Sequence, residues 1–309
     1  GANPQDAATQ SVTLDEDDLP DGSSTNVPAL TQVATLAFTA GSDTLGSFVF
    51  TGIGGLDTDA NDGTAGGTIV WVMSPGDREI KGYVNGDAMT GQLAITLTLG
   101  GATSIDPNLA GNVTVTVTLA DNFANIFADN LQTSFDLGSV TVQGSDGDDT
   151  VTGVVNVTVI DDVPSVEIAP AVADDTPATD TVAENGANLS GAITLVEGAD
   201  QDATLVISGT GFADMSFTLN GAADVTLVRT VMNGPDELGV LSVTVNAGGA
   251  ASWTFNPSLD VAGEPSFSFT ATITDADGDV DADTHTITIT DGANPQDAAT
   301  QSVTLDEDD

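Results

Sequence analysis

Carboxylates are the side chains in this sequence best suited to chemistry. Asp and Glu total 47 of the 309 residues, Lys and Arg total three, and the formal net charge is −44. Many of the acids stand in short clusters, and clustered like charges destabilise a compact protein unless something neutralises them. Ca²⁺ binds about six to eight hard oxygen ligands in a flexible shell, which several carboxylates in one turn can supply. The sequence therefore predicts bound calcium ions.

The acidic clusters recur at matching places in the two halves of the chain. Residues 145–149 read Ser-Asp-Gly-Asp-Asp and residues 275–279 read Asp-Ala-Asp-Gly-Asp, with a glycine that permits a tight bend. Each turn precedes a strand-like run that ends in aspartate. We predict these residues as calcium ligands: Asp15, Glu16, Asp17, Asp18, Asp146, Asp148, Asp149, Asp161, Asp162, Glu184, Asp275, Asp277, Asp279 and Asp291.

Other interpretations of these clusters are weaker. An isolated acidic turn is as readily a solvated loop, but recurrence next to domain ends, with few Lys or Arg to pair with, favours calcium. Zn²⁺ is disfavoured because the chain has no cysteine and one histidine, His285. Mg²⁺ stays an alternative, although it prefers fewer protein ligands.

The elements that must position these acids are strands. Residues 113–119 read VTVTVTL, residues 93–99 read LAITLTL, and residues 266–273 read SFSFTATI. Such period-two alternation predicts strands with one buried and one solvated face, and clusters of Gly, Asn and Asp separate the runs. Convincing helical periodicity is scarce. We therefore predict an all-β protein of stacked β-sandwiches.

The chain divides near residue 163. A strand-like run over residues 157–160 is followed by Asp-Asp-Val-Pro at residues 161–164, which indicates a domain end and a stiff linker. The Asp-Gly-Asp triplets of the two halves lie 131 residues apart, and the strand ends after them lie 130 residues apart. We predict a first domain over 1–162 with an insertion between Phe48 and Leu109, a second domain over 163–291, and the first strand of a further repeat over 292–309.

That further repeat follows from an exact duplication. Residues 1–18 and residues 292–309 are identical, so the period is 291 residues. The chain is expected to span about one unit of a longer tandem array, with neighbouring repeats of the same chain as its partners. Long identical repeats favour a function that depends on length and multiplicity.

Composition argues against several function classes. A net charge of −44 argues against nucleic acid as a partner, because phosphate binding needs a basic surface. The sequence has no run of 18 apolar residues, so we expect no membrane insertion by this segment. An enzyme is also not expected, since there is no cysteine nucleophile and no second histidine. A large extracellular chain without disulfides needs other stabilisation, for which metal ions are candidates.

Several segments resemble the tandem repeats of giant repeats-in-toxin (RTX) adhesins, which Gram-negative bacteria secrete by the type I pathway. They are residues 13–22 (TLDEDDLPDG), 140–162, 253–260 (WTFNPSLD) and 267–292. The resemblance implies immunoglobulin-like or cadherin-like β-sandwich extender domains in an elongated array. It also implies stiffening by Ca²⁺ and a role in cell adhesion and biofilm formation at the bacterial cell surface.

These lines together predict an extracellular structural extender that projects a distal binding region. We expect Asp161 and Asp162 in the linker to share an ion with Asp277 and Asp279 of the next domain, and with Glu16. One alternative is a glycan- or protein-binding module in the first domain, which holds Trp71 and Tyr83. Another is a secreted polysaccharide-active enzyme domain using paired carboxylates.

Overall fold

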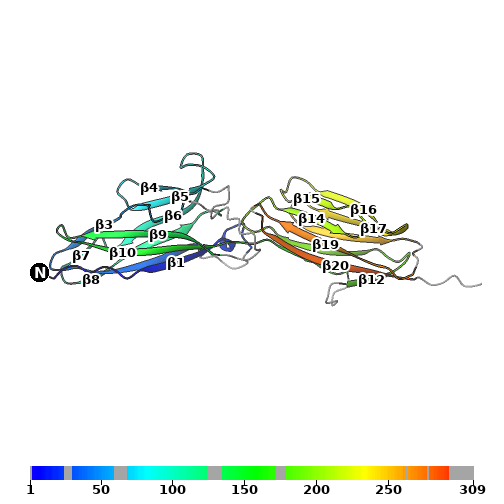
Figure 1. The fold of residues 1–309 in the computed structure, drawn as a ribbon, viewed down its shortest axis with the longest axis horizontal. Helices are drawn as coiled ribbons and strands as arrows, with labels where there is room; N and C mark the ends of the chain where they lie inside the picture. The colour runs from blue at the N-terminus through cyan, green and yellow to red at the C-terminus, as the bar shows by residue number, and fades with distance from the viewer. Residues whose placement is uncertain are drawn as a thin grey trace, which may run out of the picture.

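The computed structural model has two lobes lying end to end (Figure 1). It describes residues 2–23, 30–58, 68–123, 134–171, 179–259, 261, 263–276 and 278–291. The predicted ligand Asp277 and the repeated residues 292–309 lie outside this part.

The first domain consists of two five-stranded sheets. One sheet contains, in spatial order, β1 (Gln10–Asp15), β10 (Thr150–Ile160), β9 (Ser134–Ser145), β3 (Leu45–Phe50) and β7 (Ser104–Ile105). The other contains β2 (Thr31–Thr39), β8 (Ala110–Leu119), β6 (Gln92–Gly101), β5 (Glu79–Val84) and β4 (Val70–Met73). A short 3-10 helix, η1 (Glu16–Asp18), follows β1.

The second domain repeats this plan with two further five-stranded sheets. One contains β12 (Thr179–Ala183), β20 (Val280–Thr290), β19 (Ser266–Thr274), β14 (Thr204–Gly209) and β15 (Met215–Thr218). The other contains β11 (Ser165–Ile168), β13 (Leu189–Val196), β18 (Ala251–Pro257), β17 (Asp236–Val245) and β16 (Val225–Asn233). In each domain an edge strand runs parallel to the last strand, as β1 does with β10 and β12 with β20.

Alternation of side chains builds the two cores. Along β10 the residues facing inward are buried while Thr and Asn face outward, as period-two patterning requires. Aromatic rings fill the centres: Phe38 and Phe48 lie 5.2 Å apart in the first domain, and Trp253 and Phe269 lie 5.6 Å apart in the second. Ala199 of the second domain packs against the first domain's core, so apolar contact crosses the junction.

The predicted fold class is confirmed: the protein is all-β and its domains are β-sandwiches in tandem. The boundary predicted near residue 163 lies between the end of β10 at Ile160 and the start of β11 at Ser165.

Gly191 in β13 offers a test of this packing. A Cβ atom there would lie 2.2 Å from the carbonyl oxygen of Ala169 and 2.5 Å from Nε1 of Trp253. We expect Gly191→Ala to lower the unfolding free energy of the second domain by about 1–3 kcal/mol, measured by urea unfolding. Gly248→Ala is the control, because a Cβ there meets nothing within 4 Å. Equal stability of the two variants would contradict the packing described.

Candidate metal centre

Three buried carboxylates meet where the two domains join. Glu16 follows β1, Asp161 follows β10, and Asp200 lies in the loop between β13 and β14 of the second domain. One oxygen from each lies within 4.8 Å of the others. The exposed fractions are 0% for Glu16, 0% for Asp161 and 2% for Asp200. We call this set the junction triad; it draws on both domains and the linker between them.

Strand pairing brings two members of the triad together. The parallel pairing of β1 with β10 ends with Asp15 opposite Ile160, so the next residues, Glu16 and Asp161, emerge side by side. Their side chains therefore share the same end of the first domain. We call the end at which β10 or β20 finishes the base of its domain, and the opposite end the top.

The third member comes from the top of the second domain. Its loop passes close to the linker at Gly198, where a Cβ atom would lie 3.4 Å from Oδ2 of Asp162. Gly198 also has a φ of +79°, which favours glycine. This close approach allows the loop to bring Asp200 up to Glu16 and Asp161.

Burial makes the junction triad electrostatically costly. Burial raises the pKa of Glu16 well above its ordinary value, and Asp200 and Asp161 raise that pKa further, while the hydrogen bond from the Phe123 N–H opposes them. That N–H donates to Oε1 of Glu16 at 2.5 Å. No hydrogen-bond partner for Oε2 of Glu16 lies among the described residues. A fully buried carboxylate oxygen without a donor is suited to binding a cation.

Basic side chains lie elsewhere in the described structure. Lys81 pairs with Glu79 at 3.0 Å. Arg78 donates to the carbonyl oxygens of Phe48 and Leu99, and Arg229 donates to backbone carbonyls of its own domain. The charge of the junction triad is therefore not balanced by a described Lys or Arg side chain.

Other polar contacts hold the segments around the triad. The side-chain amide of Asn122 donates to Oδ1 of Asp200, which links the two domains directly. Asp162 accepts the N–H of Ser23 at 2.8 Å and the N–H of Ala199 at 2.9 Å, together with the hydroxyl of Ser23. Asp162 therefore connects the linker to both domains, because its carboxylate accepts hydrogen bonds from Ser23 of the first domain and Ala199 of the second.

The donor set fits calcium better than zinc. All three side chains offer hard carboxylate oxygens, the ligand type that Ca²⁺ takes, and the chain has no cysteine. Asp200 also lines a cleft of about 300 Å³, together with Asp21, Asp121 and Asn122. Glu16 and Asp161 do not line this cleft.

The residues of the first predicted cluster, 15–18, have different roles at this site. Glu16 enters the triad, whereas Asp15 caps η1 by accepting the N–H of Asp17 at 3.3 Å. Burial and then the nearby charge of Asp17 raise the pKa of Asp15 to about 6. Asp17 and Asp18 are half-buried beside the triad but are not members of it.

The two acidic turns lie at the tops of the domains. In the β9–β10 turn, Asp146 accepts the N–H groups of Asp148 and Asp149 at 3.1 and 2.8 Å. In the β19–β20 turn, Asp275 accepts the N–H groups of Gly278 and Asp279 at 3.0 and 2.8 Å. The second turn reaches the junction, but neither turn supplies a member of the triad.

Two predicted ligands lie at the base of the second domain, away from the junction. Glu184 is half-buried and accepts the N–H of Val261 at 2.9 Å. Asp291 is exposed. Within the described residues, the structure does not place a third carboxylate with this pair.

Asp200 was not among the ligands predicted from the sequence. The Glu-Gly-Ala-Asp-Gln-Asp run at residues 197–202 is acid-rich, which is a usable signal. It lacks the Asp-Gly-Asp pattern of the other clusters, and period-two patterning says nothing about which loop meets a neighbouring domain.

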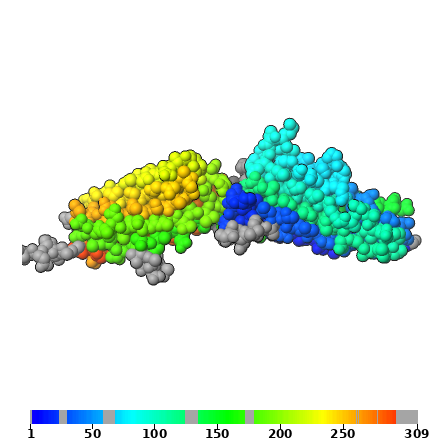
Figure 2. All heavy atoms as spheres, turned by 180° about the vertical axis from the view of Figure 1, so that it is seen from behind, coloured from blue at the N-terminus to red at the C-terminus, as the bar shows by residue number. Residues whose placement is uncertain are grey.

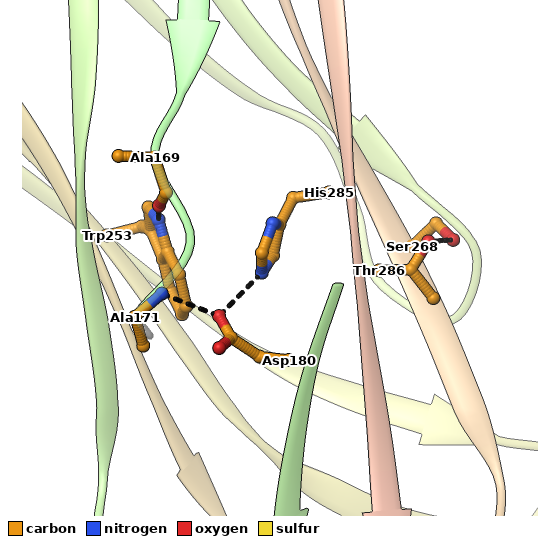
Figure 3. Close-up of polar contacts among 7 residues, drawn as sticks. All are labelled: Ala169, Ala171, Asp180, Trp253, Ser268, His285 and Thr286. Carbon is orange, nitrogen blue, oxygen red and sulfur yellow. Dashed lines mark hydrogen bonds and ion pairs between the residues drawn. The ribbon is translucent and has the colours of Figure 1, made fainter. Parts of the chain in front are cut away.

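His285 lies away from the triad, in the core of the second domain (Figure 3). Its Nε2 lies 3.0 Å from Oδ2 of Asp180, which also accepts the N–H of Ala171 at 2.7 Å. The ring packs on Trp253, with centroids 4.9 Å apart. The pair holds edge strand β12 against the core.

The side chains of both tryptophans, Trp71 and Trp253, are buried and not exposed at the surface. Trp71 is 6% exposed and its indole N–H donates to the carbonyl of Asp57, while Trp253 is fully buried and donates to the carbonyl of Ala169 at 3.0 Å. Neither offers an open ring face to a sugar. Tyr83 is half-buried in β5.

Comparisons with known proteins find only distant likenesses among solved structures. No family model and no curated protein matches the sequence. Among solved structures, the extracellular cadherin domains 1–5 of protocadherin gamma B2 are 13% identical, with 96% of this chain and 61% of that chain covered and a TM-score of 0.29. Dimeric latent PorU from Porphyromonas gingivalis is 11% identical, covering 94% of this chain and 23% of that one, with a TM-score of 0.23.

The tandem Ig repeats of Dlar are 8% identical, covering 94% of this chain and 100% of that one, with a TM-score of 0.22. Scores at this level carry no argument about function. This chain spans less than two thirds of the protocadherin and of PorU. Within the described residues, no helix has the length and apolar character needed to cross a bilayer.

The His285–Asp180 pair predicts acid sensitivity of the second domain. Burial lowers the pKa of His285 below its usual 6.5, although Asp180 and then Asp283 oppose the shift. The unfolded chain therefore takes up the proton at a higher pH than the folded chain, and stability falls as the pH drops below about 6.5. Urea unfolding of the second domain in saturating Ca²⁺, between about pH 7.5 and 5.5, measures this loss.

A matched variant comes from the first domain. Strand register places Val12 and Val155 where the second domain has Asp180 and His285. We expect Asp180→Val alone to cost about 1–3 kcal/mol, because it leaves a buried imidazole unpaired. The double variant Asp180→Val/His285→Val should recover stability and flatten the pH dependence. A parent and double variant with the same pH dependence would refute a role for His285.

Proposed function

We propose that this chain is a structural extender segment of an extracellular adhesin, in which Ca²⁺ at the domain junction fixes the relative orientation of the β-sandwiches. The observation that carries the proposal is the junction triad. It joins the base of the first domain, the linker and the top of the second domain in one buried carboxylate cluster.

An ion held by Glu16, Asp161 and Asp200 would supply the positive charge that the described basic side chains do not. Without it, three buried carboxylates repel one another across the junction. With a bound ion, the three carboxylates would each be attracted to the same positive charge. A bound ion therefore favours the closed junction, by as much as its affinity for that junction exceeds its affinity for an open one.

The shape suits a spacer. The domains lie end to end with a narrow waist between them (Figure 2). β10 has 11 residues, which at about 3.3 Å per residue span roughly 36 Å along the long axis. Repetition of a 291-residue unit would add length in proportion to copy number.

The location and secretion route in the proposal rest on the resemblance to RTX adhesin repeats. An extracellular bacterial surface holds far more free Ca²⁺ than the cell interior. Extracellular calcium modules bind with dissociation constants of about 10⁻⁴–10⁻³ M. Such a junction would lack Ca²⁺ and stay flexible before export, and it would bind Ca²⁺ and become rigid outside the cell. In this proposal the chain is not an enzyme.

Removal of one triad carboxylate tests the proposal. We expect Asp200→Asn to weaken Ca²⁺ binding by about tenfold or more, measured by isothermal titration calorimetry. Asp202→Asn is the matched control, because Asp202 is exposed in the same loop and Asn accepts its φ of 68°.

Calcium should also change the shape of the parent chain. We expect the melting temperature to fall when EDTA replaces Ca²⁺, and small-angle scattering to show a broader spread of maximum dimensions. Equal Ca²⁺ affinity of Asp200→Asn and Asp202→Asn would show that the triad does not bind Ca²⁺. An unchanged melting temperature in EDTA would show that Ca²⁺ does not stabilise the chain.

A further inference from the structure

We propose that a second copy of this chain binds along one face of the second domain, so that two chains lie side by side. The face is the outward surface of the sheet that contains β12, β20, β19, β14 and β15. We call it the neutral face; it consists of the odd-numbered residues of β12 and the even-numbered residues of the other four strands. In β19, for example, the hydrophobic odd-numbered residues are buried and the even-numbered ones are not. The neutral face lies outside the junction triad, so its role is separate from the proposed function.

The neutral face carries no charged side chain. Every one of its residues is Thr, Ser, Ala or Val. The same strands do contain acids, but alternation along the strand directs them to the other side of the sheet. Asp281 and Asp283 of β20 accept backbone N–H groups of β11, in the opposite sheet, at 2.8 and 2.7 Å. Asp180 of β12 contacts His285 in the core at 3.0 Å. The titratable side chains of these five strands therefore all point into the sandwich.

The other three sheets of the described structure carry charge on their strands. Glu79 and Lys81 lie half-buried in β5, while Asp136 in β9 and Glu167 in β11 are exposed. The chain as a whole has 47 acidic residues and a net charge of −44, so two copies that approach through most of their surfaces repel one another. Contact through the neutral face avoids placing acids directly against acids.

Hydrogen bonds between strands suit the neutral face to burial. The hydroxyls of Thr270 and Thr284 lie 2.9 Å apart, and those of Ser268 and Thr286 lie 2.8 Å apart. Hydroxyls that are already paired lose less when water is removed than unpaired hydroxyls do. Thr and Val side chains are also stiff at χ1, so a partner that covers them orders few additional rotamers. Both effects lower the cost of covering this face.

The size of the neutral face fits a weak contact that gains strength by repetition. With strands about 4.8 Å apart and a rise of about 3.4 Å per residue, the five strands make an area of roughly 500–600 Å². Stable interfaces bury about 800 Å² per partner, and transient ones bury less than about 600 Å². An array would present the face once in every 291 residues, so several weak contacts could act together.

A second copy of the chain is the partner that the neutral face fits. A strongly charged partner would find no opposite charge on it, whereas another neutral face matches it in charge, hydroxyl content and size. β19 and β20 run along the length of the second lobe, so chains joined through this sheet can lie side by side (Figure 1). A pair of identical faces has two-fold symmetry, which places the central residue near its own copy. That residue is Thr270, the middle residue of β19, which is the middle strand of the sheet.

Sedimentation equilibrium of residues 1–309 tests this inference. We expect self-association at high protein concentration that strengthens as NaCl is raised from about 0.05 to about 0.5 M, because salt screens the acids outside the neutral face. The association should persist when EDTA replaces Ca²⁺, since the neutral face does not include the triad. Association that disappears in EDTA would depend on Ca²⁺ instead of on this face and would overturn the inference.

Thr270→Glu places a charge at the centre of the neutral face. In a two-fold pair the added carboxylate meets its own copy, so we expect the association constant to fall by about tenfold or more. Thr254→Glu is the matched control, because Thr254 is the exposed middle residue of β18, the middle strand of the opposite sheet. Both variants add one negative charge to the chain. Thr284→Glu, directly opposite Thr270 in β20, repeats the test at a second position of the face.

A melting temperature close to that of the parent identifies the variants that fold. Equal association of the two face variants and the Thr254→Glu control would overturn the inference. A parent chain that stays monomeric at every salt concentration would also overturn it. If that monomeric parent binds an uncharged polysaccharide such as dextran, the face belongs to a glycan site instead. These measurements leave Ca²⁺ binding by the triad untouched, which Asp200→Asn tests separately.

Discussion

Repulsion among buried carboxylates is the constraint on which this structure depends. Two unit charges 4.8 Å apart repel by about 3 kcal/mol at an effective dielectric constant near 20. Three ionised groups hold three such pairs, and the sum rivals the about 5–15 kcal/mol by which a whole domain is stable. A junction of this kind therefore persists only with protonation of the triad or with a bound cation.

Uncharged hydroxyl side chains form cross-strand pairs on the sheets. The outward faces of β19 and β20 carry Thr and Ser, which pair across the strands, as Thr270 does with Thr284 at 2.9 Å and Ser268 with Thr286 at 2.8 Å. Many of the acids lie in the loops at the tops and bases of the domains. Charged side chains also lie on strands, as Glu79 and Lys81 do in β5 and Arg229 does in β16.

Much of this arrangement could be predicted from the sequence, for identifiable reasons. Alternation along strands such as β8 and β19 is a local signal, and it indicated the all-β fold class. Asp200 could not be predicted, because its proximity to Glu16 depends on how one domain sits on the next. The His285–Asp180 contact spans 105 residues and depends on the register of β12 against β20, which no local pattern encodes.

The parallel pairing of β1 with β10 has a mechanical consequence. β1 begins at the top of the first domain and β10 ends at its base, so tension applied along the array would pull the two strands past one another. Six consecutive residue pairs would then bear the load together instead of opening one after another. The first domain would therefore resist stretching in this direction by shear between β1 and β10.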